Sequence, residues 1–159
     1  MGQSGHQIAI SNRDFVRHGL GNGSFDQQAA GMIAHLSIGV RDLERSKGFY
    51  DSALAPLGYR CLRPGRTMLG YGYGSDNIAF WIVSVERPVP ADEKSGLHVC
   101  FVAPSAEAVD AFHAAARRAG GHDNGAPGPR PIYGADYYAA FIIDPDGYRI
   151  EAYYGPPET

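Results

Sequence analysis

Hydrophobic positions follow the same order of spacings twice along the chain, first from residue 33 and again from residue 97. Over 33–40 apolar residues alternate with polar ones, which predicts a strand with one apolar face. A helical spacing follows over 43–54, directly after Asp42, whose side chain suits a helix N-cap. Three shorter apolar runs then predict strands at 59–62, 68–73 and 78–83. This half therefore has the order β-α-β-β-β.

The second half repeats that order after a polar, proline-containing connection over 84–96. A strand is predicted at 97–102, and Ser105 is the N-cap of a helix that runs to about residue 119, before Gly120 and Gly121. Residues 122–131 are rich in Gly, Pro and Asn and are expected to form a loop. Strands are expected at 132–133 and at 137–143. A turn follows over 144–147, where Pro, Asp and Gly favour chain reversal, and the last strand runs from there to Tyr154.

The two halves align without gaps at an offset of 63 residues, which indicates an internal duplication. Near the hairpins the offset grows to 70, because the loop before the last strands is longer in the second half. The matched pairs are His35 with His98, Asp42 with Ser105, Phe49 with Phe112, Gly58 with Gly121, and Trp81 with Glu151. We assign the two modules to 32–84 and 96–154.

Composition narrows the class of protein. The 159 residues fit one domain. The net charge is −3, and the sequence has no basic cluster of the kind that nucleic-acid binding requires. No window approaches the roughly 18 consecutive apolar residues of a membrane span. The two cysteines form neither a disulfide framework nor a Cys-x-x-Cys motif, which favours a reduced, cytoplasmic protein.

Residues 1–31 lack a sustained hydrophobic period and differ from the patterned domain over 32–159. We expect them to be a poorly ordered extension or leader. The alternative is a short arm that packs on a partner subunit through its few apolar residues.

Three polar residues occupy related places in the repeat: His35, His98 and Glu151. The two histidines hold the same position in the first strand of each module, and Glu151 stands in an otherwise apolar strand, where an unpaired charge is costly. Two imidazoles and one carboxylate are typical of a divalent-metal site with positions open to substrate. Each histidine can instead be an ordinary half-buried strand residue, and Glu151 can be a structural carboxylate bonded to a tyrosine or to Arg149.

The chain resembles the vicinal oxygen chelate superfamily, which includes glyoxalase I, fosfomycin-resistance transferases, extradiol dioxygenases and bleomycin-resistance proteins. The resemblance covers 32–154 and is carried by Ile33–His35, Val40–Tyr50, Leu97–Val99 and Asp144–Glu151. It implies an α+β fold in which paired βαβββ modules form a cupped eight-stranded mixed sheet with helices on the outer side.

The same resemblance implies that His35, His98 and Glu151 hold a divalent ion, with Fe, Mn, Ni, Co and Zn as candidates, and that Glu151 takes part in catalysis. The fourth ligand of glyoxalase I falls at Trp81, whose indole cannot replace a carboxylate, which argues against glyoxalase I activity on a glutathione adduct.

Four further residues are assigned to the pocket around the metal: Trp81, Cys100, Tyr153 and Arg130. Trp81 is either a pocket wall or a core aromatic. Cys100 shares the strand face of His98 but also suits a small core position. Tyr153 shares the face of Glu151, and Arg130 either fixes an anionic substrate or is a plain surface arginine.

The resulting expectation is a homodimeric, metal-dependent lyase, dioxygenase or transferase that acts on a small oxygen-rich molecule. The competing expectation is a metal-free protein that sequesters a small aromatic or drug-like ligand, as the abundance of tyrosine suggests.

Overall fold

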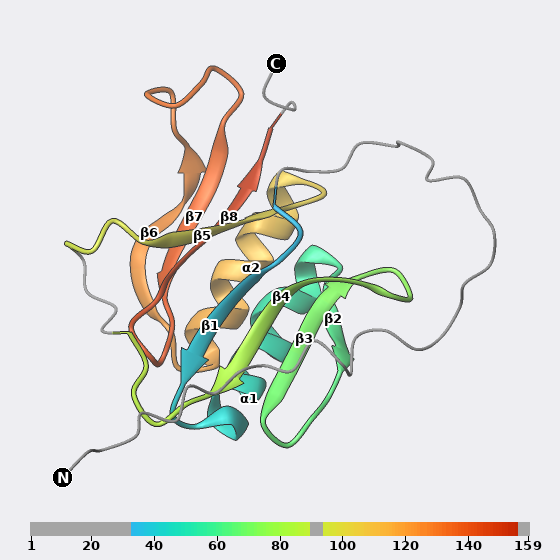
Figure 1. The fold of residues 1–159 in the computed structure, drawn as a ribbon. Coiled ribbons are helices and arrows are strands. Elements are labelled where there is room, and N and C mark those ends of the chain that lie inside the picture. The colour runs from blue at the N-terminus through green and yellow to red at the C-terminus, as the bar shows by residue number, and fades with distance from the viewer. Residues whose placement is uncertain (1–32, 90–93, 156–159) are drawn as a thin grey trace, which may run out of the picture. The chain divides into compact units, whose positions relative to one another are not determined.

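The computed structural model describes residues 33–89 and 94–155, and the expected N-terminal extension over 1–31 lies outside them. Two βαβββ modules follow each other along the chain (Figure 1). The first module consists of β1 (Leu36–Val40), α1 (Leu43–Leu54), the 3-10 turn η1 (Ala55–Leu57), β2 (Arg60–Arg63), β3 (Met68–Tyr73) and β4 (Asn77–Ser84). The second consists of β5 (His98–Val102), α2 (Ala106–Arg118), β6 (His122–Pro129), β7 (Tyr138–Ile143) and β8 (Arg149–Tyr154).

The eight strands form two four-stranded mixed sheets, with the orders β1-β4-β3-β2 and β5-β8-β7-β6. In each sheet the first and last strands of the module pair in parallel, and the other neighbours are antiparallel. The predicted two-module α+β fold is confirmed, with its eight strands divided equally between two sheets. No helix in the described part of the chain is long and apolar enough to cross a membrane.

Both helices begin at the predicted caps. The Asp42 carboxylate accepts a hydrogen bond from the backbone N–H of Arg45 at 3.0 Å, and the Ser105 hydroxyl accepts one from Ala108 at 3.2 Å. Each bond satisfies one of the N–H groups that the first helical turn leaves without a partner. The two caps are 63 residues apart, so the duplication is visible at the level of single hydrogen bonds.

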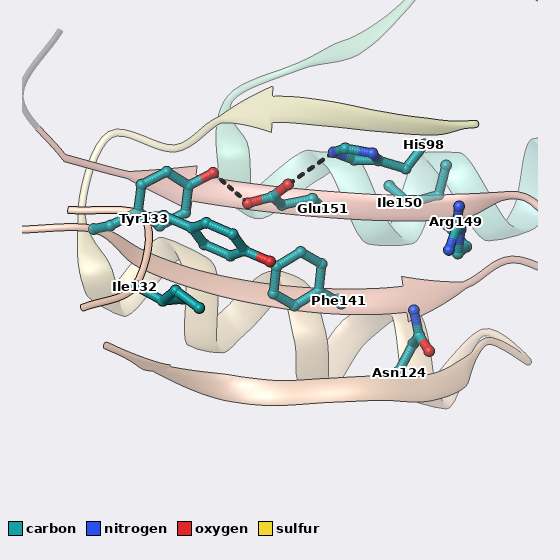
Figure 2. Close-up of a pocket in the computed structure, with 9 residues that line it drawn as sticks. His98, Asn124, Ile132, Tyr133, Phe141, Arg149, Ile150 and Glu151 are labelled. Carbon is teal, nitrogen blue, oxygen red and sulfur yellow. Dashed lines mark hydrogen bonds and ion pairs between the residues drawn. The ribbon is translucent and has the colours of Figure 1, made fainter. Parts of the chain in front are cut away.

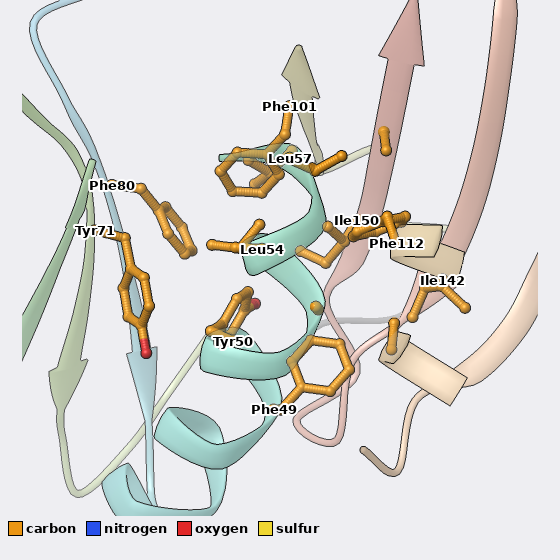
Figure 3. Close-up of a cluster of buried hydrophobic side chains, with 14 of the residues drawn as sticks. Phe49, Tyr50, Leu54, Leu57, Tyr71, Phe80, Phe101, Phe112, Ile142 and Ile150 are labelled. Atoms are coloured by element: carbon orange, nitrogen blue, oxygen red, sulfur yellow. The ribbon is translucent and has the colours of Figure 1, made fainter. Parts of the chain in front are cut away.

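One hydrophobic core joins the two modules, because the helices contact each other and the apolar faces of both sheets turn toward them. Phe80 and Phe101, one from each sheet, meet edge to face with ring centroids 5.2 Å apart. Figure 3 shows α1 between side chains of both sheets, with Leu54 and Tyr50 toward Phe80 and with Ile150 on its other side. Among the described residues, no helix therefore covers the opposite face of either sheet.

A polar contact also ties α1 to the turn between β7 and β8. The buried Tyr50 hydroxyl donates to Oδ2 of Asp144 at 2.7 Å, and Oδ1 of Asp144 accepts from the backbone N–H groups of Asp146 and Tyr148. Arg45 forms an ion pair with Asp146 at 2.6 Å. The turn is thus fixed by a helix that lies about a hundred residues earlier in the chain.

Two local predictions in the second module are wrong. Residues 122–129 form strand β6 instead of a loop, with breaks in the pairing register on both sides of Gly125. Pairing with the regular strand β7 supplies hydrogen bonds that outweigh the turn-forming composition of this segment. Residues 132–133, expected as a strand, lie in a turn in which the backbone N–H of Tyr133 donates to the carbonyl of Arg130 at 2.9 Å.

Candidate active site

Strand register places His98 and Glu151 on one face of the second sheet. In the parallel pairing of β5 with β8, His98 lies opposite Arg149 and Cys100 lies opposite Glu151. Ile150 and Ala152 point into the core, so by strand alternation Arg149, Glu151 and Tyr153 point to the other side. We call the side that bears Glu151 the open face of the second sheet.

Glu151 is held between two partners. Its Oε2 lies 3.2 Å from Nε2 of His98, and its Oε1 accepts a hydrogen bond of 2.6 Å from the hydroxyl of Tyr137. The glutamate side chain is 4% exposed, whereas that of His98 is 49% exposed, so the histidine is the part of the pair that solvent reaches. Burial and the bond to Glu151 both raise the pKa of the Tyr137 hydroxyl, which keeps it a donor.

A pocket of about 590 Å³ opens beside this pair (Figure 2). Its polar lining comes from His98, Arg149, Glu151 and, across the sheet, Asn124 of β6. Its apolar lining comes from Phe141 on β7 and from Ile132 and Tyr133 in the segment between β6 and β7, which also supplies Tyr137. Figure 2 shows Glu151 near the middle of the pocket, with Tyr133 and Ile132 at one end and Arg149 and Asn124 at the other.

Contacts between tilted aromatic rings hold the segment that supplies Tyr137. The Tyr137 ring lies 4.1 Å from that of Tyr153 and 5.3 Å from that of Tyr133, measured between centroids. Arg130 places its guanidinium carbon 5.5 Å from the Phe141 ring centroid and donates to the carbonyl of Ala126 at 2.6 Å. Tyr153 and Arg130, both predicted pocket residues, therefore lie against the pocket walls Tyr137 and Phe141.

The remaining predicted site residues lie elsewhere. His35 is exposed just before β1 and, together with His98 and Cys100, lines a second pocket of about 460 Å³. Cys100 is exposed on β5. Trp81 lies on the first sheet, on the face away from its helix, where a Cβ atom added to Gly70 would be 2.9 Å from the indole.

Register confirms which backbone position Trp81 occupies. Ser37 of β1 lies opposite Trp81 in β4, and Cys100 of β5 lies opposite Glu151 in β8. Ser37 and Cys100 are 63 residues apart, and Trp81 and Glu151 are 70 apart, as in the sequence repeat. The indole therefore holds the place in the first module that the carboxylate holds in the second.

The spacing of His98 and Glu151 suits two ligands of one metal ion. Two ligand atoms that each lie about 2.1 Å from a metal, at a right angle to each other, are roughly 3 Å apart. The 3.2 Å between Nε2 and Oε2 matches this separation. Within one chain, however, no group of three or more His, Cys, Asp or Glu side chains among the described residues can hold a metal, so His35 does not complete the set there.

Sequence reasoning missed seven of the residues that line this pocket: Asn124, Ile132, Tyr133, Tyr137, Phe141, Arg149 and Ile150. Arg149 and Phe141 could have been predicted from the strand pattern. Arg149 shares the strand face of Glu151, and Phe141 is the antiparallel partner of Glu151. Tyr137 and Asn124 could not be predicted in this way, because Tyr137 precedes β7 and Asn124 lies at the register break between Asp123 and Gly125 in β6, where alternation does not apply.

Comparison with known proteins agrees with the fold. Residues 32–152 match the model of the Glyoxalase/Bleomycin resistance protein/Dioxygenase superfamily. A glyoxalase/bleomycin resistance protein from Albidiferax ferrireducens is similar at 35% identity and a TM-score of 0.66, over 79% of this chain and 100% of that one.

Two more distant structures share the fold. The fosfomycin resistance protein FosX from Mesorhizobium loti has 22% identity and a TM-score of 0.58, over 81% of this chain and 95% of its own. A glyoxalase/bleomycin resistance protein/dioxygenase family enzyme from Burkholderia phytofirmans has 18% identity and a TM-score of 0.57, over 76% of this chain and 95% of its own. A comparison with curated proteins found no significant match. The chain belongs to the Glyoxalase/Bleomycin resistance protein/Dioxygenase superfamily.

Proposed function

We propose that the protein is a dimeric, metal-dependent enzyme that acts on a small oxygen-rich molecule. In this proposal His98 and Glu151 of one chain hold a divalent ion together with His35 of a second chain. The observation that carries the proposal is the contact of 3.2 Å between His98 and Glu151 on the open face of the second sheet, beside a pocket of small-molecule size.

Two features support a contribution from a second chain. His35 and His98 are equivalent in the repeat, yet only His98 reaches Glu151 within one chain. In addition, both sheets use their helix-covered faces for the common core, and large apolar side chains are exposed at the second sheet and its loop, including Val102, Ile132 and Tyr133. A second copy of the chain would cover such side chains.

The residues of the chain have distinct roles in this scheme. When bound, a divalent ion would act as a Lewis acid toward two oxygen atoms of the substrate. Tyr137 holds Oε1 of Glu151, which leaves Oε2 directed at His98. A divalent ion would use the lone pair of Nε2 of His98, so the neutral ring would carry its proton on Nδ1.

Subunit mixing tests this arrangement directly. Protein purified without chelators is expected to contain about one metal ion per chain, and His35→Ala and Glu151→Ala are each expected to abolish binding. When the two variants are unfolded and refolded together, half of the dimers combine one of each, and one of their two sites is intact. About one quarter of the sites are then expected to recover. The exposed His122, replaced by alanine, is the matched control and should bind like the wild type.

The outcomes separate the possibilities. If neither variant binds and the mixture recovers nothing, the site lies within single chains and the intersubunit part of the proposal fails. If wild-type protein binds none of Fe, Mn, Ni, Co or Zn, the proposal of metal-dependent chemistry fails as a whole.

A second candidate function is the binding of a small aromatic molecule without a metal. It is favoured by one observation: both carboxylate oxygens of Glu151 already have partners within the chain, in Tyr137 and His98. It predicts that ligand affinity, measured by calorimetry, is the same with and without a chelator and survives His35→Ala. A large loss of affinity on chelation would contradict it.

A further inference from the structure

The charged groups of the pocket around Glu151 are unevenly placed. Glu151 is its one acidic lining residue among the described residues, and it is hydrogen-bonded. Arg149 lines the pocket, and the guanidinium of Arg130 lies over the ring of Phe141, which also lines it. Away from Glu151 the pocket therefore favours negative charge in a ligand.

Arg149 is held in place by its own strand pair. It lies opposite His98 in the β5–β8 register, and its Nε–H donates to the carbonyl of Leu97 at 3.3 Å. A guanidinium has five N–H donors in a planar fork, and a carboxylate or phosphonate accepts two of them side by side. The backbone contact fixes the plane of the fork relative to the sheet.

Asn124 adds a neutral donor at the same end of the pocket. It belongs to β6 and lies at the register break between Asp123 and Gly125. Gly125 has φ of 151°, and a Cβ there would lie 2.9 Å from the Phe141 ring, so the glycine lets that ring lie close against β6. Figure 2 shows the Asn124 amide directed toward the part of the pocket that contains Arg149.

The spacing between Arg149 and Glu151 indicates the size of ligand that could reach both side chains. A strand rises about 3.3 Å per residue, so the Cα atoms of Arg149 and Glu151 are roughly 6.6 Å apart. That separation is close to the length of a substituted benzene ring, and Phe141, the antiparallel partner of Glu151, supplies an aromatic wall beside it.

We propose that Arg149 and Asn124 form a subsite for an anionic group, a carboxylate or a phosphonate, on a ligand whose apolar or aromatic part lies against Phe141 and Tyr133. This inference gives the substrate class of the enzyme described above and in that sense rests on the proposed function. The anion itself is bound by side chains of this chain, in the absence of any metal.

Binding of small probes to full-length protein in the presence of a chelator tests the subsite. Benzoate and phenylphosphonate are titrated separately and followed by two-dimensional NMR, with neutral benzamide as the matched probe. Saturable shifts are expected at the amides of residues 98, 124, 141 and 149 for at least one of the two anions. Comparing their affinities shows whether the subsite prefers a carboxylate or a phosphonate, and neutral benzamide should bind at least tenfold more weakly.

Variants assign the effect to Arg149. Arg149→Met should weaken anion binding at least tenfold, and Arg149→Lys, which keeps the charge without the planar fork, should restore part of it. Arg63→Met removes an exposed arginine from β2 and should change nothing. Wild-type spectra away from the pocket show whether each variant is folded.

Three results would overturn the inference: no saturable binding of either anion up to about 50 mM, equal binding of benzamide, or wild-type affinity in Arg149→Met. None of them depends on a metal, so the subsite can fail while the metal-dependent function stands. The reverse also holds, since anion binding in chelator would persist in a protein that binds no metal.

Discussion

The buried contact between Tyr50 and Asp144 makes a sharp prediction about stability. Tyr50→Phe removes only the hydroxyl that donates to Oδ2 of Asp144 at 2.7 Å, and both side chains are almost completely buried. A hydrogen bond to a charged group contributes about 1.5–3 kcal/mol, and a buried charge that loses its partner costs the upper part of that range. We therefore expect the free energy of unfolding at pH 7 to fall by about 2–3 kcal/mol.

The pH dependence of this loss follows from Asp144. Burial raises the pKa of its carboxyl, although the Tyr50 hydroxyl and the two backbone N–H groups act in the opposite direction. A carboxyl whose pKa is higher in the folded state favours folding at low pH, and this contribution is lost as pH rises through the folded-state pKa. Removing the Tyr50 donor raises that pKa further, so the deficit of Tyr50→Phe should shrink as the pH falls from 7 toward the ordinary aspartate value.

Urea unfolding at a fixed protein concentration, followed by circular dichroism at pH 7.5 and pH 5, measures both quantities. With a slope of about 1–3 kcal/mol per molar urea, the expected loss moves the midpoint by roughly 1 M at pH 7.5. Tyr148→Phe is the matched control, because the buried Tyr148 hydroxyl donates to a neutral acceptor, the carbonyl of Gly39, at 2.8 Å. Its loss should be about 1 kcal/mol and independent of pH. A deficit for Tyr50→Phe below about 0.5 kcal/mol, or one equal at both pH values, would refute the reasoning.

Three further predictions concern the site and the duplicated framework. Tyr137→Phe should lower metal affinity by about 10- to 100-fold in competition titrations, because the hydroxyl orients a proposed ligand; unchanged affinity would show that Glu151 is positioned without it. Gly125→Ala should destabilise the protein by about 1–3 kcal/mol in thermal unfolding, because φ of Gly125 is positive and the Phe141 ring occupies the space that the Cβ would need. Its control, Gly48→Ala on the exposed side of α1, should stabilise the protein by up to about 1 kcal/mol, because alanine favours a helix more than glycine does. Asp42→Ala and Ser105→Ala should each cost about 1 kcal/mol, and a clear cost at only one of the two would show that the equivalent caps have diverged in their energetic role.

Sequence reasoning succeeded where the physical signal is local and periodic. The caps Asp42 and Ser105, the alternation in β5 and β8, and the repeat offsets are all carried by near neighbours in the chain, and the structure contains each of them. It failed in β6, where glycine and proline are typical of loops but pairing with β7 imposes a strand. The contact of Tyr137 with Glu151 spans 14 residues and depends on how one segment folds over the sheet, which no local pattern records.

That contact has a consequence for how the protein can change. The segment between β6 and β7 supplies apolar walls to the pocket and also the hydroxyl that positions Glu151. In many enzymes, loops vary freely to alter selectivity while the reactive groups stay on the scaffold. Here the same segment lines the pocket and orients Glu151, so in the proposed enzyme a variant chosen for a new ligand by altering this segment would also change the orientation of the carboxylate. Selectivity and reactivity are therefore expected to evolve together in this chain.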